Sequence, residues 1–417
     1  MKILVLSHRH WYYVAHGIER FLPMSRHLAQ KGHEVTMMYL PVPSLDYSLV
    51  HDNYRIDLDS PVCMAMDKTD RCRALFIPDL RSRRSIVNRL GPHARAANDF
   101  LRSLQEVAVG ASCLLADYDL VHIEYLFDSP LVFSGLLSRS LKRVPHIIDF
   151  VDLVGPLIKP SKYYKLLSRI GYLPTWTTVC SEYLRSCLIG KGFPRDTVFK
   201  IPMGADLKKV RLVGKEQARK ELGLSQDQRF VGFELAPWGI HDEYVDVLLR
   251  SFGKILDHLA GVKMLFIGST IHPPLDRIHQ KISAAGLDRN VVCTGLLRTD
   301  ELSLWLGACD VLVLPLRDVP YDHAKFPGRV GDYLAAGRPI VAAAVGEMQE
   351  IVSKGCGLLA RPGDPQDFAS KILSVLKHDE LMREMGEKSR HLAENEYSWE
   401  SVADRLETVY QEVIDAH

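Results

Sequence analysis

The sequence predicts an α/β protein built from two doubly wound, Rossmann-like domains, each with a parallel sheet. Short runs of branched apolar residues alternate with helical patterns along the whole chain, as they do in parallel sheets. The runs form two sets of similar size, and 417 residues suit two domains of about 200 residues each. We predict an N-terminal domain over residues 1–195, a second domain over 196–390 and a closing helical segment over 391–417.

The predicted strands have the length and branching of buried parallel strands. In the first half they are residues 3–6, 35–39, 120–123, 147–151 and 175–180. In the second half they are residues 230–235, 263–267, 291–294, 311–314 and 340–343. Residues 201–204 read as a strand end followed by turn residues, so we place the change of domain nearby.

The closing segment predicts an amphipathic helix. Ser398 suits the N-cap, and Glu400 suits the positive end of the helix dipole. One face is apolar and consists of Trp399, Val402, Leu406, Val409 and Val413.

Composition predicts a globular cytoplasmic protein without nucleic-acid partners. The chain is 47% apolar and 25% charged, with a net charge of +1, so no global charge favours nucleic acid. Its eight cysteines form no Cys-x-x-Cys pair, which indicates a reducing compartment. The apolar run 107–116 is far shorter than the ~20 residues of a membrane span. A strand begins within two residues of the N-terminus, so no signal peptide is expected.

Residues 68–102 are rich in arginine, with apolar residues interspersed. One interpretation is a basic, partly amphipathic surface that meets an anionic membrane, at its inner face, or a phosphate-bearing acceptor. The other is a solvated helical face beside an arginine-rich loop. The sequence leaves both open.

Residues 325–341 are the most informative segment. They follow the predicted strand 311–314, and a helix there should end at Gly337, with Pro339 beyond it. Lys325, Arg329 and the helix start therefore lie at the carboxyl end of a strand, where α/β sheets bind ligands and helix N-termini favour anions. Asp332, one turn later, suits sugar hydroxyls, so we expect a phosphate ligand that carries a polyol.

This segment resembles the donor-binding segment of the nucleotide-sugar glycosyltransferases of family 4, in the branch reading Lys-x-Pro-x-Lys-x-x-Glu-Tyr-x-Ala-x-Gly-x-Pro. Residues 2–6 with 32–36, residues 201–206 and residues 397–400 also resemble family motifs, in the family's order. The resemblance spans almost the whole chain. It implies the GT-B architecture, with two Rossmann-like domains facing a central cleft and a last helix that crosses back to the first domain.

The resemblance also implies the reaction. A nucleoside diphosphate sugar, with UDP-sugar or GDP-sugar expected, gives its sugar to a hydroxyl of a glycan, a lipid-linked acceptor or a small molecule. Retention of configuration and front-face attack are expected, with the donor phosphate helping to deprotonate the acceptor and domain closure excluding water. We expect neither metal nor cofactor. The sequences Asp117-Tyr118-Asp119 and Asp57-Leu58-Asp59 have the spelling of a metal motif, but both are interpreted as structural.

Several positions depart from the family pattern. Ala324 stands where the family has a first glutamate, and Asp332 stands at the second, which holds the ribose. No Arg or Lys occurs in residues 233–243, where the family has a phosphate-binding pair. The first loop has one glycine of the usual two, and the loop after residue 148 has aspartates in place of a histidine.

The resemblance and the strand ends together give the predicted site. The predicted catalytic residues are Asp152, Asp149, Lys325 and Arg329. The predicted donor-binding residues are His16, Gly17, Trp238, His241, Gly268, Gly295, Leu296, Lys325, Phe326, Pro327, Gly328, Arg329, Val330 and Asp332. The departures support a rival hypothesis, a non-catalytic nucleotide-sugar-binding or scaffold protein of the same fold. A phosphorylase or epimerase has no sequence feature in its favour.

Overall fold

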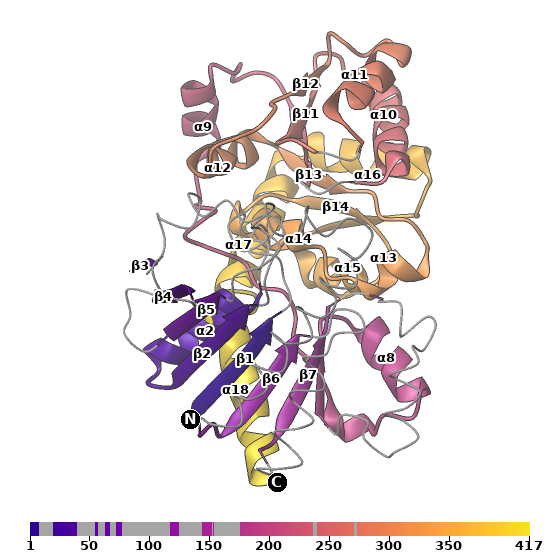
Figure 1. Ribbon diagram of the computed structural model, residues 1–417. Helices are drawn as coiled ribbons and strands as arrows, with labels where there is room; N and C mark the ends of the chain where they lie inside the picture. The colour runs from indigo at the N-terminus through magenta and orange to yellow at the C-terminus, as the bar shows by residue number, and fades with distance from the viewer. Residues whose placement is uncertain are drawn as a thin grey trace, which may run out of the picture. The chain divides into compact units, whose positions relative to one another are not determined.

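The computed structural model describes residues 1–7, 20–39, 55–56, 63–66, 72–76, 117–124, 144–151, 153, 176–236, 240–270 and 273–417. These residues form two compact units, each with its own sheet (Figure 1). Unit 1 comprises Met1–Pro202 and Trp399–His417, and unit 2 comprises Met203–Ser398. The predicted class, two Rossmann-like α/β units, is confirmed.

Unit 1 contains a nine-stranded sheet in the order β3-β4-β5-β2-β1-β6-β7-β8-β9. Strands from β5 to β9 are parallel, whereas β3 and β4 run antiparallel to their neighbours. The strands are β1 Lys2–Ser7, β2 Glu34–Tyr39, β3 Arg55–Ile56, β4 Cys63–Met66, β5 Cys72–Phe76, β6 Leu120–Glu124, β7 His146–Phe150, β8 Trp176–Val179 and β9 Val198–Lys200. The helices described in this unit are α2 Phe21–Gln30, α8 Glu182–Gly190, the 3₁₀ helix Arg195–Thr197 and α18 Trp399–Asp415.

The helix α18 completes the core of unit 1 although it comes from the end of the chain. It lies along the strands of this unit in Figure 1 and packs on α2. The predicted apolar face is the buried one: Val402, Leu406, Val409 and Val413 are buried. Leu28 and Phe21 of α2 belong to the same core, so the amphipathic pattern of the last helix is matched by an apolar face within unit 1.

The interpretation of residues 68–102 as a helical face is wrong at its start. Cys72–Phe76 is strand β5, paired in parallel with β2. Sheet pairing overrides the weak helical pattern of these residues. The rest of the basic segment, including its possible membrane contact, lies outside the described residues.

Unit 2 contains a six-stranded parallel sheet in the order β12-β11-β10-β13-β14-β15. The strands are β10 Phe230–Glu234, β11 Lys263–Ile267, β12 Val291–Cys293, β13 Val311–Leu314, β14 Ile340–Ala343 and β15 Gly357–Ala360. The helices are α9 Lys215–Leu222, α10 Asp242–Leu256, α11 Leu275–Ala284, α12 Thr299–Ala308, α13 Pro320–Ala324, α14 Gly328–Ala335, α15 Glu347–Ile351, the π-helix Val352–Cys356, α16 Pro365–Leu376 and α17 Asp379–Asn395. Every predicted strand of either unit coincides with an observed strand to within a residue or two.

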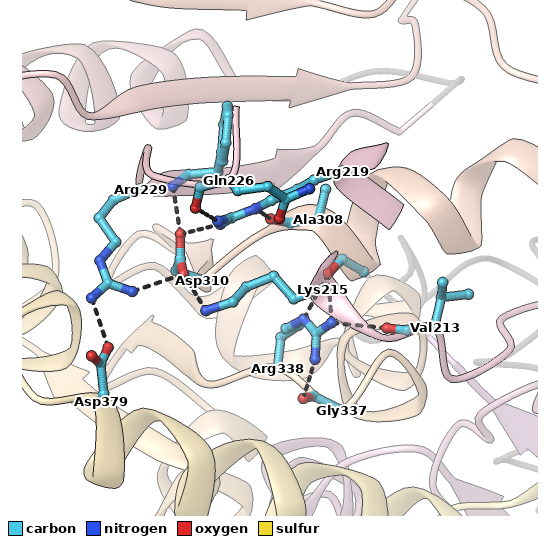
Figure 2. A network of polar contacts seen from close by, with 12 residues as sticks. Val213, Lys215, Arg219, Gln226, Arg229, Ala308, Asp310, Gly337, Arg338 and Asp379 are labelled. Atoms are coloured by element: carbon cyan, nitrogen blue, oxygen red, sulfur yellow. Dashed lines mark hydrogen bonds and ion pairs between the residues drawn. The ribbon is translucent and has the colours of Figure 1, made fainter. Parts of the chain in front are cut away.

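A buried aspartate ties the amino edge of this sheet together (Figure 2). Asp310, just before β13, is fully buried and accepts from the Arg219 guanidinium at 2.7 Å and from the backbone N–H of Phe230 at 2.7 Å. Lys215 and Arg229 also bind this carboxylate. The network borders a cavity of about 580 Å³, on the edge opposite the strand ends that bind ligands in such sheets.

In the part of the chain that the structure describes, no helix is both long and apolar enough to cross a membrane.

Candidate functional site

The candidate site lies at the carboxyl edge of the sheet in unit 2. Strands β10 and β13 are neighbours there, with β11 and β12 on one side and β14 and β15 on the other. Strand order therefore reverses between β10 and β13, and α/β sheets bind their ligands in the crevice at such a reversal. Glu234 ends β10, and α14 follows β13 along the chain, so residues from both segments meet at this edge.

Helix α14 is held in place by glycine. Gly331 packs so closely that a Cβ atom there would lie 2.7 Å from the carbonyl oxygen of Gly204 and 3.1 Å from Cα of Ala205. Gly337, at φ +64°, ends the helix as the sequence predicts. The packing fixes the first turns of α14, which carry Arg329 and Asp332.

Arg329 lies at this edge and forms no ion pair with any residue that the structure describes. Its guanidinium lies 5.1 Å from the centroid of the Phe233 ring, a cation–π contact. Its Nη1 is buried and has no hydrogen-bond partner among the residues that the structure describes. A buried guanidinium nitrogen without an acceptor is costly unless a ligand supplies one.

Asp332 lies in a cluster of charges with Glu234 and Lys209. Its Oδ2 accepts from Lys209 Nζ at 3.0 Å. Burial, followed by the Asp332 charge, raises the pKa of Glu234 to about 8. Although burial opposes it, the charges of Asp332 and Glu234 raise the pKa of Lys209 above its ordinary value.

Lys325 is already paired within unit 2. Its Nζ donates to Asp322 Oδ1 at 2.8 Å and to the Tyr244 hydroxyl at 2.8 Å. Asp322 is fully buried, and its Oδ2 also accepts from Tyr244 at 2.7 Å. Although burial opposes it, hydrogen bonding and charge from Lys325 lower the pKa of Asp322 to about 2. Two of the three ammonium donors are therefore used, and the third has no acceptor among the described residues.

The other predicted residues of unit 2 fall into two groups. Phe326, Pro327 and Val330 are buried in the core at the start of α14, whereas Gly328 is exposed.

The His241 and Tyr244 rings form a T-shaped pair. Burial lowers the pKa of the His241 imidazole.

Two glycines follow β11 and β12 at this same edge. Gly268, at φ +93°, donates its N–H to Thr294 Oγ1 at 2.8 Å. Gly295 has φ +72°. Leu296 is 87% exposed, which leaves an apolar side chain open beside the strand ends.

In unit 1, Asp149 is fully buried at the end of β7. Its Oδ1 accepts from Arg20 at 3.0 Å and from the Thr178 hydroxyl at 2.6 Å. This burial argues against the predicted sugar contact and gives Asp149 a structural role, since an internal ion pair requires its charge. Asp152, His16, Gly17 and Trp238 lie outside the described residues.

The two Asp-x-Asp sequences that resemble a metal-binding motif lie in the N-terminal half of the chain. Asp119 Oδ2 accepts from the backbone N–H of Lys2 at 2.6 Å, which is a structural contact at the amino edge of the sheet. Asp57 and Asp59 lie outside the described residues.

Sequence reasoning missed four residues of the site: Lys209, Glu234, Tyr244 and Asp322. A signal existed for Glu234, because an acid that ends a central strand of an α/β sheet lies where ligands bind. The other three have no local signal. Lys209 follows turn residues, and Tyr244 is placed against Asp322 only by the folded chain.

Comparisons with known proteins agree on one class of fold. Residues 230–378 match the model of the family described as glycosyl transferases group 1. An uncharacterized glycosyltransferase of Methanocaldococcus jannaschii is 23% identical over 330 residues, 78% of this chain and 84% of the relative. A D-inositol 3-phosphate glycosyltransferase of Corynebacterium aurimucosum is 23% identical over 368 residues, 81% of this chain and 83% of the relative.

Two solved structures extend the likeness over the whole chain. Sucrose-phosphate synthase from Thermosynechococcus elongatus has a TM-score of 0.70 and 18% identity, covering 100% of both chains. The Anabaena protein HepE in complex with UDP and glucose has a TM-score of 0.66 and 15% identity, covering 99% of this chain and 100% of that one. At these identities the structures show a shared fold.

Proposed function

We propose that this chain, a glycosyltransferase of the GT-B fold, transfers a sugar from a nucleoside diphosphate sugar to a hydroxyl acceptor. Breaking the bond between sugar and phosphate builds negative charge on the leaving diphosphate. Fixed cations and amide dipoles at that position lower the barrier by several kcal/mol in a water-excluded site. The carboxyl edge of unit 2 offers such groups.

One observation carries this proposal: the buried Nη1 of Arg329 has no partner in the described part of the chain. It lies in the first turn of α14, where backbone N–H groups and the helix dipole also favour anions. A diphosphate supplies acceptor oxygens in the number and geometry that a guanidinium binds best. A permanently solvated surface arginine would not have a buried, unpaired nitrogen.

The other residues of this edge have supporting roles in the proposal. Lys325 gives its remaining N–H to the leaving phosphate, and Asp332 accepts from the ribose hydroxyls. Gly268 and Gly295 let main chain approach the nucleotide, and Leu296 lies under the base. HepE, which has the same fold, was solved in complex with UDP and glucose. That complex supports a donor sugar carried on UDP or a similar nucleoside diphosphate. We further propose a retaining, metal-independent transfer, with the donor phosphate taking the acceptor proton.

A ligand panel tests the donor class. Thermal unfolding is measured with UDP, GDP, ADP and TDP and their common sugar conjugates, first without metal and then with Mg²⁺. A ligand at 100 times its Kd stabilises by about 2.7 kcal/mol, a shift of several degrees. One nucleotide that shifts the metal-free protein supports the proposal, whereas no shift with any of them contradicts it. An assay of sugar transfer from the corresponding nucleotide sugar then distinguishes an enzyme from the non-catalytic binding protein.

Replacing Arg329 by alanine should weaken nucleotide binding about 10- to 100-fold, because one charge-assisted hydrogen bond contributes about 1.5–3 kcal/mol. Titration calorimetry with the nucleotide from the panel measures the loss. Arg383→Ala is the matched control, since Arg383 is 54% exposed and pairs with acids of its own helix. Equal affinities for the Arg329 and Arg383 variants would show that the phosphate assignment is wrong.

A further inference from the structure

Arg317 lies at the carboxyl edge of unit 2, in the loop that follows β13. Strand order reverses between β10 and β13, and α/β sheets bind ligands in the crevice at such a reversal. Residues 233–243, at the end of β10 and after it, contain no Arg or Lys. Arg317 therefore brings to this reversal a positive charge that the β10 side lacks.

Asp322 holds Arg317 by its main chain and by its side chain. Asp322 Oδ2 accepts from the backbone N–H of Arg317 at 2.8 Å and from its Nε at 3.2 Å. The same carboxylate accepts from Lys325 Nζ at 2.8 Å and from the Tyr244 hydroxyl at 2.7 Å. Because a carboxylate accepts about four hydrogen bonds, these donors saturate the fully buried Asp322. It can therefore act on a ligand only through the side chains that it holds.

Most N–H groups of the Arg317 guanidinium have no acceptor among the residues that the structure describes. Of its side-chain nitrogens, only Nε donates a hydrogen bond within these ranges, to Asp322. Nη1 lies 3.6 Å from Glu243 Oε1, a distance too long for a hydrogen bond. Nη1 and Nη2 together form a fork that matches two oxygens of one phosphate group. The side chain is 26% exposed, so it is accessible to a ligand.

The two cations carry more charge than their shared carboxylate neutralises. Asp322 offers one negative charge to both Arg317 and Lys325. Glu243, which also contacts Arg317, is 60% exposed, and water screens so exposed a charge. Burial lowers the pKa of Lys325, and so do the charges of Arg329 and Arg317, although the hydrogen bond from Lys325 opposes this shift. An anion bound by these cations would relieve their mutual repulsion.

We propose that Arg317 and Lys325 bind the diphosphate of the donor together, and that Asp322 is the positioning residue for both cations. This inference rests on the proposed function and adds Arg317 to the residues that hold the donor. Arg317 gives its Nη fork to one phosphate group, and Lys325 adds its remaining N–H. Arg329 lies in α14, so cations from two segments that follow β13 serve the two phosphate groups.

Arg317→Ala should weaken the binding of UDP, GDP or ADP, whichever the wild type binds, about 10- to 100-fold. The parent nucleoside has no phosphate, so its affinity should stay within about threefold of wild type. Titration calorimetry with the diphosphate and with the nucleoside measures both. Arg361→Ala is the matched control, because Arg361 follows β15 at the same edge and pairs with Asp364, and it should bind as wild type does. Equal diphosphate affinities of the two variants, or an equal loss for diphosphate and nucleoside, would overturn the proposal.

Arg317→Lys tests the positioning role without altering Asp322. Lysine keeps the charge but lacks the fork, so it cannot pair with Asp322 and also bind two phosphate oxygens in parallel. Its diphosphate affinity should therefore be about tenfold below that of wild type. Wild-type affinity in this variant would show that charge alone acts.

A double-mutant cycle measures the coupling of Asp322 to Arg317. In an Asp322→Asn background that circular dichroism shows to be folded, Arg317→Ala should cost less than about threefold, because the guanidinium is no longer held. Additive losses would show that Asp322 does not position Arg317. Where Asp322→Asn does not fold, Arg317→Lys decides the positioning role.

The outcomes separate this inference from the proposed function. A wild type that binds none of the three diphosphates contradicts both. A wild type that binds one of them, loses affinity in Arg329→Ala and keeps it in Arg317→Ala contradicts this inference alone.

Discussion

At the scale of single residues, unit 1 contains a buried chain of hydrogen bonds with one consistent direction. Arg20 and the Thr178 hydroxyl both donate to Asp149. Thr178 Oγ1 lies 3.1 Å from His122 Nε2, and His122 Nδ1 lies 2.6 Å from the Tyr410 hydroxyl. Because Thr178 donates its only proton to Asp149, His122 must donate from Nε2 and accept from Tyr410 at Nδ1. Burial, with the Arg20 charge, lowers the pKa of His122 well below its ordinary value, so the imidazole is neutral as this direction requires.

Replacing Tyr410 by phenylalanine should destabilise the protein by about 1–3 kcal/mol, since it leaves the buried Nδ1 of His122 without a donor. Denaturant unfolding of the variant measures the change. Tyr321→Phe removes the same hydroxyl from a ring in unit 2 that is 45% exposed, and it should stay within about 0.5 kcal/mol of wild type. Equal stability of the two variants would show that the chain of hydrogen bonds contributes nothing.

At this scale the sequence predicted part of the candidate site and missed the rest for a physical reason. Arg329 and Asp332 could be predicted at the carboxyl edge of the sheet because a buried strand precedes them and a glycine ends their helix. Glu234 was read only as an absent cation. The charges of Lys209 and Asp332 act on the Glu234 carboxyl group. Lys209 and Asp332 are distant in sequence and meet only after folding.

At the scale of elements, the branched apolar strands of the central sheets and the amphipathic last helix were predictable, whereas several other strands were not. The strands of the central sheets coincide with their predicted ranges, and α18 buries the predicted face. The unpredicted strands include β3 Arg55–Ile56 and β9 Val198–Lys200, which are two and three residues long. A segment of two or three residues is too short to show an alternation of apolar and polar residues. These segments become strands because they pair with neighbouring strands.

Helix α14 gives a prediction at this scale. Gly331→Ala places a Cβ atom against the backbone of residues 204 and 205, which cannot move as a side chain can. The helix should shift, with a loss of about 1–3 kcal/mol in stability and weaker nucleotide binding, because Arg329 and Asp332 move with it. Thermal unfolding and calorimetry measure the two effects. Gly328→Ala in the same helix has no atom within 4 Å of the added Cβ, so a similar loss of stability in that control would contradict the packing argument.

At the scale of the whole molecule, the chain enters unit 1, passes through all of unit 2 and returns to unit 1. The returning helix is not an accessory, because Leu406 and its buried neighbours form one core with α2 and β1. Both ends of the chain therefore belong to one unit, while unit 2 is a continuous segment.

Leu406→Asp should abolish the soluble folded protein, since an unpaired buried carboxylate costs several kcal/mol. Gln411→Asp introduces the same residue on the exposed face of the same helix and should leave yield and melting temperature near those of wild type. Soluble yield and circular dichroism of the two variants make the comparison. A soluble, fully folded Leu406→Asp variant would show that unit 1 does not depend on α18.

The return of α18 to unit 1 sets an order of events during synthesis. Ribosomes add about 5–20 residues per second, so residues 203–398 take roughly 10–40 s to make. Throughout that interval the strands of unit 1 have emerged without the helix that covers α2. Unit 2 has its complete sequence before unit 1 does, and is expected to fold first. The nascent N-terminal half therefore exposes the apolar residues of α2 and β1 that α18 later covers.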